Sequence, residues 1–433
     1  MEIAQIAKRI EANGGRLYLV GGAVRDWLMK LPQKDSDYCV VGLSKERFQQ
    51  LFPHAKVTGQ SFPVFRMPAD GTEAEFAMAR KERKVGLGHT GFEFDANESI
   101  TLEQDLSRRD LTINAIAKDV LTDEVFDPFH GQSDLLSCTL RAVSDAFCED
   151  PLRVYRAARF AAQLSFRIHA DTIRLMNALK DELSCLSPER VFEELRKALR
   201  TKRPSIFFRA LREARVLDVH FPELDGLVGV LQPPRYHPEG DAFEHTMQCI
   251  DAVALLTDSA AGNRELMPVK SDEVRFSTLL HDVGKGVTPP YKWPSHRGHE
   301  KAGVPLVESL CSRLKVPATW VKSAKFATQE HMRIHNLHAT KPEQVVDLLT
   351  KADRNPLSVE GFALVGLADM RGRNHPEAHC KNAETMPNLW EFIRASTEGN
   401  QKPPDMPGAE YGRVIMAKRA DAVVKWRQKH RTR

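Results

Sequence analysis

Two aspartates, Asp35 and Asp37, stand two positions apart just before an apolar run at residues 38–41. The run predicts a strand, and side chains two positions apart on a strand face the same side. The two carboxylates are therefore expected to converge on one point. Paired hard oxygen ligands of this kind suit Mg²⁺ and the phosphates of a nucleoside triphosphate.

A glycine turn upstream of the aspartates supplies a place for those phosphates. The apolar residues 17–20 predict a buried strand that ends at Gly21 and Gly22. Glycine allows the sharp turn and the close approach of backbone to ligand. Residues 23–28 then predict a helix whose first N–H groups suit a phosphate.

The string GGAVRD followed by DxD resembles the nucleotidyltransferases of the class II tRNA nucleotidyltransferase and bacterial poly(A) polymerase superfamily. The resemblance implies that Asp35 and Asp37 are catalytic and bind Mg²⁺. It also implies that Gly22 and Arg25 cradle the phosphates of ATP or CTP.

A third acidic residue on a nearby strand completes the metal site in the resembled family. Residues 73–80 have the pattern of a strand and contain Glu75, which we take as the candidate. Glu73 competes for the same role.

The segment DLSRRDLTINAIA, residues 105–117, matches the second motif of this family. The match implies that an arginine contacts the triphosphate, and Arg109 is our candidate. Asp110 and Asn114 are expected to order the sugar or the local turn.

A predicted helix at residues 149–160 carries Asp150, Arg153, Arg156 and Arg159 at intervals of three, roughly along one stripe. An aspartate beside an arginine offers both acceptors and donors to the Watson–Crick edge of a base. Cytosine and adenine each present an amino donor next to an acceptor, so one Asp–Arg pair satisfies either.

In the resembled family the motif EDxxR selects C and A without a nucleic-acid template, and here it falls on Asp150 and Arg153. Arg156 and Arg159 are then assigned to triphosphate binding or base stacking. The plainer interpretation of the stripe is a solvated face, but the apolar residues on the same helix leave little room for solvent.

Composition excludes several other classes of protein. The chain has 433 residues, 42% hydrophobic and 28% charged, enough for two to four domains. No apolar run approaches membrane-spanning length, the start lacks the layout of a secretory signal, and the seven cysteines are scattered. We therefore expect a cytoplasmic enzyme without a membrane partner.

Residues 141–215 hold 16 basic and 10 acidic residues. This local excess of positive charge favours a surface track that binds a polyanion.

The proline-rich residues 232–238 predict a linker, and the chain changes character after it. The string HDVGKG begins at His281 and Asp282, at the end of an apolar helix. With His245 upstream and Asp369 downstream, it resembles an HD-type phosphohydrolase domain. The resemblance implies that these four residues hold a metal.

Imidazole and carboxylate ligands from separate helices suit a transition metal such as Ni²⁺ better than Mg²⁺ alone. His296, His299 and His331 are further candidates that the sequence does not separate, and Lys285 is a candidate for a substrate phosphate.

These observations predict an α+β protein. A small mixed or antiparallel-sheet nucleotidyltransferase head (1–140) precedes an all-helical neck and body that selects the base and binds tRNA (141–227). A helical HD domain (228–375) and a helical tail (376–433) follow, and the terminal helix is expected to be solvated.

The order of motifs is similar to that of the CCA-adding tRNA nucleotidyltransferases that carry an HD domain. The implied reaction is addition of C, C and A to the tRNA 3′ end from CTP and ATP. The HD domain implies metal-dependent phosphatase, 2′-nucleotidase and 2′,3′-cyclic phosphodiesterase activity. The alternatives are a poly(A) polymerase and an HD phosphohydrolase whose head only binds tRNA. The chain is expected to act as a monomer or homodimer.

Overall fold

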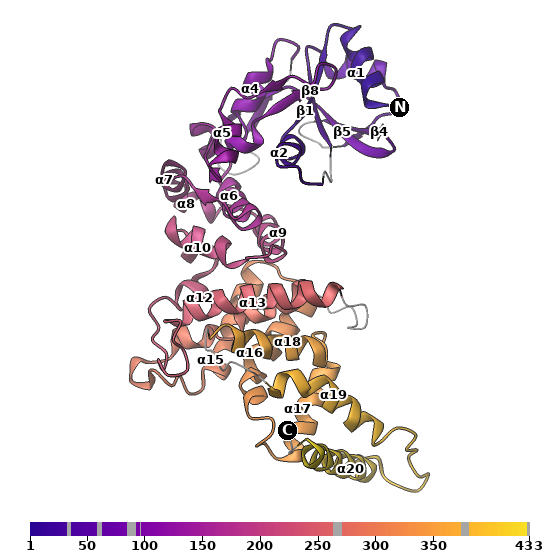
Figure 1. Ribbon diagram of the computed structural model, residues 1–433, viewed down its shortest axis with the longest axis vertical. Helices are drawn as coiled ribbons and strands as arrows, with labels where there is room; N and C mark the ends of the chain where they lie inside the picture. The colour runs from indigo at the N-terminus through magenta and orange to yellow at the C-terminus, as the bar shows by residue number, and fades with distance from the viewer. Residues whose placement is uncertain are drawn as a thin grey trace. The chain divides into compact units, whose positions relative to one another are not determined.

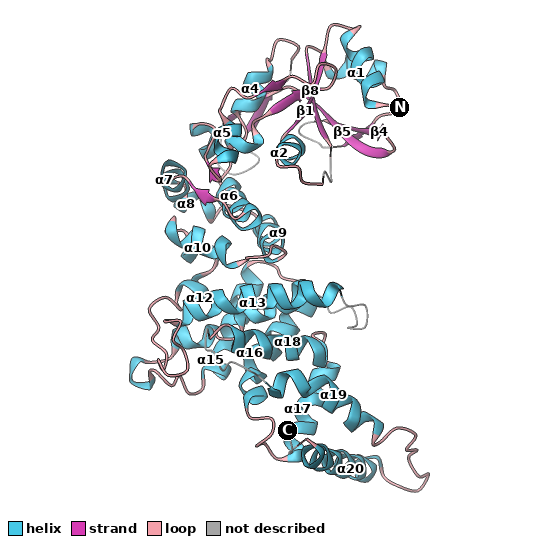
Figure 2. Ribbon diagram, in the orientation of Figure 1, coloured by secondary structure: helices cyan, strands magenta, loops and turns pink. Residues whose placement is uncertain are grey.

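The computed structural model describes residues 1–32, 36–58, 63–84, 92–95, 97–262, 271–373 and 381–430 (Figure 1). The chain divides into two compact units: residues 1–190 with 213–216, called the first unit here, and residues 191–212 with 217–433, called the second unit. Figure 2 shows strands gathered in the first unit, whereas the second unit is built from helices. The expected combination of a mixed-sheet head with a helical remainder is confirmed.

The first unit is built on a mixed seven-stranded sheet of order β3-β4-β5-β2-β1-β8-β9. Strand β2 runs parallel to β5, and every other neighbouring pair in this sheet is antiparallel. The strands are β1 (Arg16–Val20), β2 (Asp37–Val41), β3 (Lys56–Thr58), β4 (Val64–Ala69), β5 (Thr72–Met78), β8 (Ala117–Asp119) and β9 (Val125–Phe126).

Both faces of this sheet are covered. Along β1, Leu17 belongs to a buried cluster with residues of α1 and α3, whereas Tyr18 and Val20 belong to a second cluster with residues of α4. A strand buried on both faces is apolar throughout, which explains the unbroken run that predicts it.

The helices of the first unit surround this sheet and continue beyond it. They are α1 (Ile3–Glu11), α2 (Gly22–Leu28), α3 (Lys45–Leu51), α4 (Leu102–Ser107), α5 (Gly131–Leu136), α6 (Leu152–Leu164), α7 (Ala170–Ala178), α8 (Lys180–Leu183) and the first turn of α9 (Pro188–Leu199). Short 3₁₀ helices cover Thr112–Asn114 and Asp145–Glu149. Two small strand pairs, β6 (Lys81–Lys84) with β7 (Phe92–Asp95) and β10 (Thr139–Leu140) with β11 (Arg167–Ile168), complete the unit.

The second unit is helical throughout its described residues. After the rest of α9 it contains α10 (Ser205–Glu213), α11 (Leu217–His220), α12 (Pro222–Asp225), α13 (Ala242–Gly262), α14 (Ser271–Leu280), α15 (His299–Arg313), α16 (Ala318–His335), α17 (Pro342–Arg354), α18 (Ser358–Arg371), α19 (Lys381–Ala395) and α20 (Gly408–Lys429). Short 3₁₀ helices cover Val283–Val287 and Pro290–Lys292. None of the helices within the described ranges combines the length and apolar character that crossing a bilayer requires.

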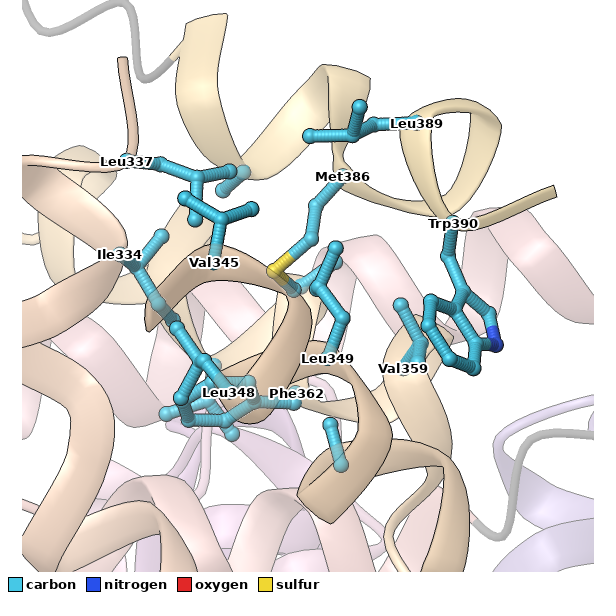
Figure 3. Close-up of a cluster of buried hydrophobic side chains, with 14 of the residues drawn as sticks. Ile334, Leu337, Val345, Leu348, Leu349, Val359, Phe362, Met386, Leu389 and Trp390 are labelled. Atoms are coloured by element: carbon cyan, nitrogen blue, oxygen red, sulfur yellow. The ribbon is translucent and has the colours of Figure 1, made fainter. Parts of the chain in front are cut away.

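The core of the second unit draws on helices from α13 to α20. Figure 3 shows side chains such as Leu349, Phe362 and Met386 converging from α17, α18 and α19. The terminal helix joins this core through Ala422 and Val423, which are almost fully buried. The expectation of a solvated terminal helix was therefore wrong, because one face of α20 is apolar enough to pack.

Candidate active sites

The glycine turn lies where β1 ends and α2 begins. Gly21 has φ 68°, a left-handed value that favours glycine. A Cβ at Gly21 would lie 2.9 Å from Nη1 of Arg109. The first and second sequence motifs therefore meet at this turn, and its positive φ is the reason that glycine is favoured there.

Asp37 is the first residue of β2, and its direct partner on β5 is Glu75. Residues paired across neighbouring strands point to the same face of the sheet. Glu75 accepts a hydrogen bond from Arg66 of β4, its partner on the other side. Glu73 lies one pleat further along and pairs with Pro68 rather than with a residue of β2. The register thus brings Glu75, and not Glu73, next to Asp37. Asp35 lies outside the described residues.

Arg25 connects α2 to the second motif. It is 4% exposed, donates to Asp26 at 2.7 Å, and donates to Oδ1 of Asn114 at 2.8 Å. Asn114 in turn donates to Oδ1 of Asp110 at 3.1 Å, and Arg156 donates to Oδ2 of Asp110 at 2.8 Å. The expected role of Asp110 and Asn114 in local order agrees with this chain of contacts.

Asp110 remains ionised in this buried network. Burial acts to raise its pKa, but the charge of Arg156 and the hydrogen bond from Asn114 outweigh burial and lower the pKa to about 2. The charged carboxylate of Asp110 therefore holds the guanidinium group of Arg156 in place.

Asp105 anchors the arginine pair of the second motif. Its buried carboxylate accepts from Arg108 at 2.7 Å and from Arg109 at 3.1 Å. Burial acts to raise the pKa of Asp105, and the two arginines together lower it below its ordinary value. The carboxylate thereby holds two guanidinium groups side by side.

The two residues assigned to base selection have different partners. Oδ2 of Asp150 accepts from Arg190 at 2.9 Å, and Oδ1 caps α6 by accepting from the N–H of Leu152 at 3.0 Å. Arg153 donates to the carbonyls of Ala146 at 2.7 Å and Arg108 at 2.6 Å. Both side chains are therefore held in place by contacts outside the pair.

Arg156 and Arg159 of the stripe, together with Arg25 of α2, lie around the aromatic ring of Phe160. The guanidinium carbon of Arg159 lies 3.9 Å from the centroid of Phe160, and those of Arg25 and Arg156 lie at 5.2 and 5.7 Å. Guanidinium groups over a ring face gain cation–π stabilisation. Phe160 thus helps to hold three positive groups that would otherwise repel one another.

Most of these groups line one cleft of about 690 Å³ in the first unit. Its lining includes eight arginines and four aspartates, so the wall has an excess of positive charge. Of the residues assigned from the sequence, the cleft is lined by Gly22, Arg25, Asp37, Arg109, Asp150, Arg153, Arg156 and Arg159. Glu75 is not in the lining but lies in register with Asp37.

A second group of polar side chains is buried in the second unit. Nε2 of His245 on α13 lies 3.2 Å from Oδ1 of Asp369 on α18 and 3.6 Å from Oδ2 of Asp282. Nε2 of His281 lies 3.4 Å from the same Oδ2. The four residues assigned to the HD site from sequence are therefore brought together by three separate segments.

Two of the three histidines left open by the sequence belong to this centre. Nε2 of His299 and Nε2 of His331 lie 3.1 and 3.4 Å from Oδ1 of Asp282. The two oxygens of Asp282 therefore face different histidine pairs. His296 instead contacts Thr288 and the carbonyl of Leu231.

The donor set of this centre fits metal ions. Nδ1 of His281 bonds to the carbonyl of Thr278 at 2.7 Å, while its buried Nε2 has no hydrogen-bond partner among the described residues. A ring anchored at Nδ1 presents Nε2 as a ligand. His245, His281 and Asp369, with Cys249, form one possible ligand group, and Asp282, His299 and His331 form another.

Burial acts to lower the pKa of His245, but its contacts with Cys249, Asp369 and Glu239 outweigh burial and raise that pKa well above the ordinary value, so this imidazole must lose a proton before it binds a metal. Two other ligands already have the charge that metal binding requires. Burial lowers the pKa of His331 to about 4, which leaves its imidazole neutral near pH 7. Burial opposes ionisation of Asp282, but Lys285 and His281 outweigh it and hold the pKa of that carboxyl well below its usual range. Neutral imidazole and ionised carboxylate are the forms that coordinate metals.

Backbone packing brings the two halves of the HD site together. A Cβ at Gly284 would lie 1.9 Å from the carbonyl oxygen of His299, and one at Gly303 would lie 2.6 Å from a methyl group of Thr328. The first glycine of HDVGKG is thus needed for the close approach of α15, which carries His299.

Several contacts of the sites have no clear signal in the sequence, although Glu189 and Arg190 resemble the last neck motif of the resembled family, which supports the base-selecting helix. Arg190 reaches Asp150 across 40 positions, which no periodicity shows. Residues Gln232, Tyr236 and His237 line the HD cavity although they fall in the segment expected to be a linker. His335, 2.6 Å from Oδ2 of Asp369, could have been found from its position one helical turn after His331.

Three family comparisons cover most of the chain. Residues 17–141 match the poly A polymerase head domain, and residues 165–227 match the family described as the probable RNA and SrmB- binding site of polymerase A. Residues 242–355 match the HD domain.

Solved structures are similar over nearly the full length. A structure described as a tRNA-processing enzyme is 22% identical, with 97% of this chain and 96% of that chain covered and a TM-score of 0.62. A CCA-adding enzyme in complex with ATP is 18% identical (97% and 88% covered, TM-score 0.67). A Thermotoga maritima CCA-adding enzyme in complex with tRNA is also 18% identical (97% and 90% covered, TM-score 0.64). In domain composition, domain order and fold, the chain resembles a CCA-adding enzyme with a C-terminal HD domain.

Proposed function

We propose that the chain adds CCA to the 3′ end of tRNA, using CTP and ATP, and that its HD domain hydrolyses phosphate esters. The observation that carries the first activity is the arginine-lined cleft, in which Asp37, Asp150 just before α6 and Arg153 of α6 line one space. The resemblance to CCA-adding enzymes solved with ATP and with tRNA supports the choice of substrates.

In this proposal the phosphates lie against Gly22, Arg25 and Arg109. Asp35 and Asp37, with Glu75 as third carboxylate, hold Mg²⁺, which when bound activates the primer 3′-OH and stabilises the leaving pyrophosphate. The 3′ oxygen forms a bond to the α-phosphorus while the bond to the β-phosphate oxygen breaks.

Base selection falls to Asp150 and Arg153, with Arg190 keeping the Asp150 carboxylate oriented. Asp150 offers acceptors to the amino group that cytosine and adenine share, and Arg153 offers donors to the adjacent ring nitrogen. Arg156 and Arg159 bind triphosphate or stack on the base.

The HD domain is proposed to act as a metal-dependent phosphatase, 2′-nucleotidase and 2′,3′-cyclic phosphodiesterase. His245, His281, Asp282 and Asp369 hold a transition metal such as Ni²⁺, which when bound supplies an activated water. His299 and His331 complete a second ligand group around Asp282.

For the whole chain we propose a head at 1–140, a base-selecting and tRNA-binding neck at 141–227, the HD domain at 228–375 and a tail at 376–433. The enzyme is proposed to act in the cytoplasm as a monomer or homodimer.

The decisive experiment supplies tRNA lacking CCA with Mg²⁺ and with CTP and ATP, separately and together. Growth by three nucleotides that requires both is the expected result, and Asp37→Ala is expected to abolish it. A long ladder with ATP alone would indicate a poly(A) polymerase. No growth would leave the head as a tRNA-binding module beside an HD hydrolase.

A further inference from the structure

The HD site opens into a cavity of about 190 Å³ in the second unit. Asp282, Asp369, His299 and His331 are among its lining residues, and so are Gln232, Tyr236, Lys285, Met332 and Arg373. This space admits several water molecules and is large enough for a phosphoryl group.

Gln232 has an unusual position in this wall. It is 4% exposed, and its Oε1 accepts a hydrogen bond from Nζ of Lys285 at 2.7 Å. An ammonium group only donates, so this contact fixes which end of the amide faces Lys285. The amide nitrogen is consequently turned away from Lys285.

The Nε2 atom of Gln232 is buried and has no hydrogen-bond partner among the described residues. Leaving such a donor unpaired costs on the order of 1–3 kcal/mol. A buried donor at the wall of a cavity that is also lined by Asp282, His299, His331 and Asp369 is well placed to meet an acceptor on a bound molecule.

The neighbouring groups indicate what that acceptor is. Lys285 lies on one side of Gln232, and Arg373 also lines the cavity and donates to Asp369 at 3.2 Å. Both cations are paired with carboxylates of the site, Lys285 with Asp282 at 2.5 Å and Arg373 with Asp369. They retain further N–H donors, and together with the Gln232 amide these donors favour a phosphoryl group, which has several acceptor oxygens.

The opening of the cavity suits the base of a nucleotide. Tyr236 and Met332 line the cavity but are 56% and 40% exposed. An exposed aromatic ring offers a stacking surface to any nucleobase. The small interior and this rim together fit a nucleoside monophosphate that inserts its phosphate and leaves its base outside.

We propose that Gln232 is a substrate-binding residue of the HD domain, whose amide N–H groups donate to a phosphoryl oxygen of a nucleoside monophosphate. The proposal rests on the proposed hydrolase function of this site and adds the residue that recognises the phosphate. The role is one of binding, so its loss affects KM more than kcat.

The test uses the full chain loaded with Ni²⁺ and compares the wild type with Gln232→Glu and Gln232→Met. The glutamate keeps an acceptor for Lys285 but replaces the donor with a negative oxygen, and the methionine removes both. Binding of inorganic phosphate is measured by calorimetry, and kcat and KM are measured with 2′-AMP. Gln344→Glu, on the exposed face of α17, adds the same charge away from the site and is the matched control.

The expected result is at least tenfold weaker phosphate binding and at least tenfold higher KM in Gln232→Glu, with kcat changed less than threefold. Gln232→Met should weaken phosphate binding about three- to tenfold and raise KM by a similar factor. Gln344→Glu should change neither phosphate binding nor KM. Metal content and tRNA extension, measured on each variant, show whether the chain remains folded and loaded.

Unchanged phosphate affinity in both Gln232 variants would overturn the proposal and would mean that a buried water satisfies the amide. A wild type that binds no phosphate would overturn it as well. A wild type that binds phosphate through Gln232 but hydrolyses no nucleotide would instead contradict the proposed hydrolase activity and leave the binding role supported.

Discussion

Asp110 carries its negative charge at a position that is 6% exposed, between Arg156 and Asn114. A buried carboxylate is tolerated only when it is paired and hydrogen-bonded, and here both conditions hold. Its ionisation is therefore coupled to the folding of the first unit.

We expect Asp110→Asn to destabilise the first unit by about 2 kcal/mol at neutral pH. The pKa of Asp110 is lowered from 3.8 to about 2 in the folded chain, nearly two units, and each unit corresponds to about 1.4 kcal/mol. Because the folded pKa is depressed, this stabilisation is present above pH 4 and is lost as the pH falls from about 4 to about 2. Urea denaturation of wild type and variant between pH 7 and pH 3 measures the difference.

The control is Asp171→Asn, because Asp171 also pairs with an arginine, Arg174, but both side chains are more than half exposed. Exposed pairs contribute little, so this variant should change stability by less than about 0.5 kcal/mol. Equal effects of the two substitutions, or a difference that does not shrink on acidification, would contradict the argument for Asp110.

The family resemblance and the helical spacing together identified eight of the residues that line the cleft, but not all of their partners. Helical spacing showed that Asp150 and Arg153 lie near one another, since three positions make almost one turn. It could not show that Arg190 binds Asp150, because that contact depends on how α9 packs against α6. Gln232 was missed for a related reason: it stands in a proline-rich segment whose composition indicates only a turn.

The register of β2 and β5 separates two glutamates that the sequence left as alternatives. Glu75 pairs with Asp37 on β2 and with Arg66 on β4, whereas the described residues give Glu73 a partner on β4 only, Pro68. Strand pairing is set by the whole sheet, so alternation within one strand cannot choose between two residues on the same face.

We expect Glu75→Gln to lower kcat for nucleotide addition at least tenfold and to raise the Mg²⁺ concentration needed for half-maximal rate. The reason is the loss of a carboxylate beside Asp37. Glu73→Gln is the matched control on the same face of the same strand and should change kcat less than twofold. Primer extension across a Mg²⁺ titration distinguishes them, and a larger effect at Glu73 would exclude Glu75 as the third carboxylate.

Helix α20 was predicted as an element, but its docking was not. Val423 is fully buried in the core of the second unit, whereas the adjacent Val424 is 38% exposed. Six lysines and arginines are spread along this helix of 22 residues, and its narrow buried face is formed by Ala420, Ala422 and Val423.

We expect Val423→Ala to destabilise the second unit by about 2 kcal/mol, through lost burial and the cavity left behind. Val424→Ala should cost less than about 0.5 kcal/mol. Hydrogen exchange of α17 and α19, which contact α20, measures the local effect. Similar protection in the two variants would show that α20 adds little to the core.

At the scale of the whole molecule, the two candidate sites belong to different compact units. Among the described residues, the side chains that line the first site all belong to the first unit, and those that line the second site all belong to the second unit. The two chemistries should therefore be separable by substitution.

We expect Asp282→Asn to abolish hydrolysis of 2′-AMP while tRNA extension stays within twofold of the wild type. Asp37→Ala should do the reverse, because each of the two residues belongs to the site of its own unit. Both activities are measured on the same preparation of each full-length variant. A joint loss in either variant, in protein that remains folded by circular dichroism, would mean that the sites depend on each other.

The contact of Gly284 with the backbone of α15 has a consequence for how the HD site can change. The spacing between the turn that carries Asp282 and the helix that carries His299 is set by main-chain atoms rather than by the ligands themselves. Ligand side chains can therefore be exchanged, for example His299 for glutamate, without moving the scaffold that presents them. Such exchanges would alter which metal ion the site prefers, while the location of the site stays fixed. Metal preference can therefore diverge among chains that keep Gly284 and Gly303.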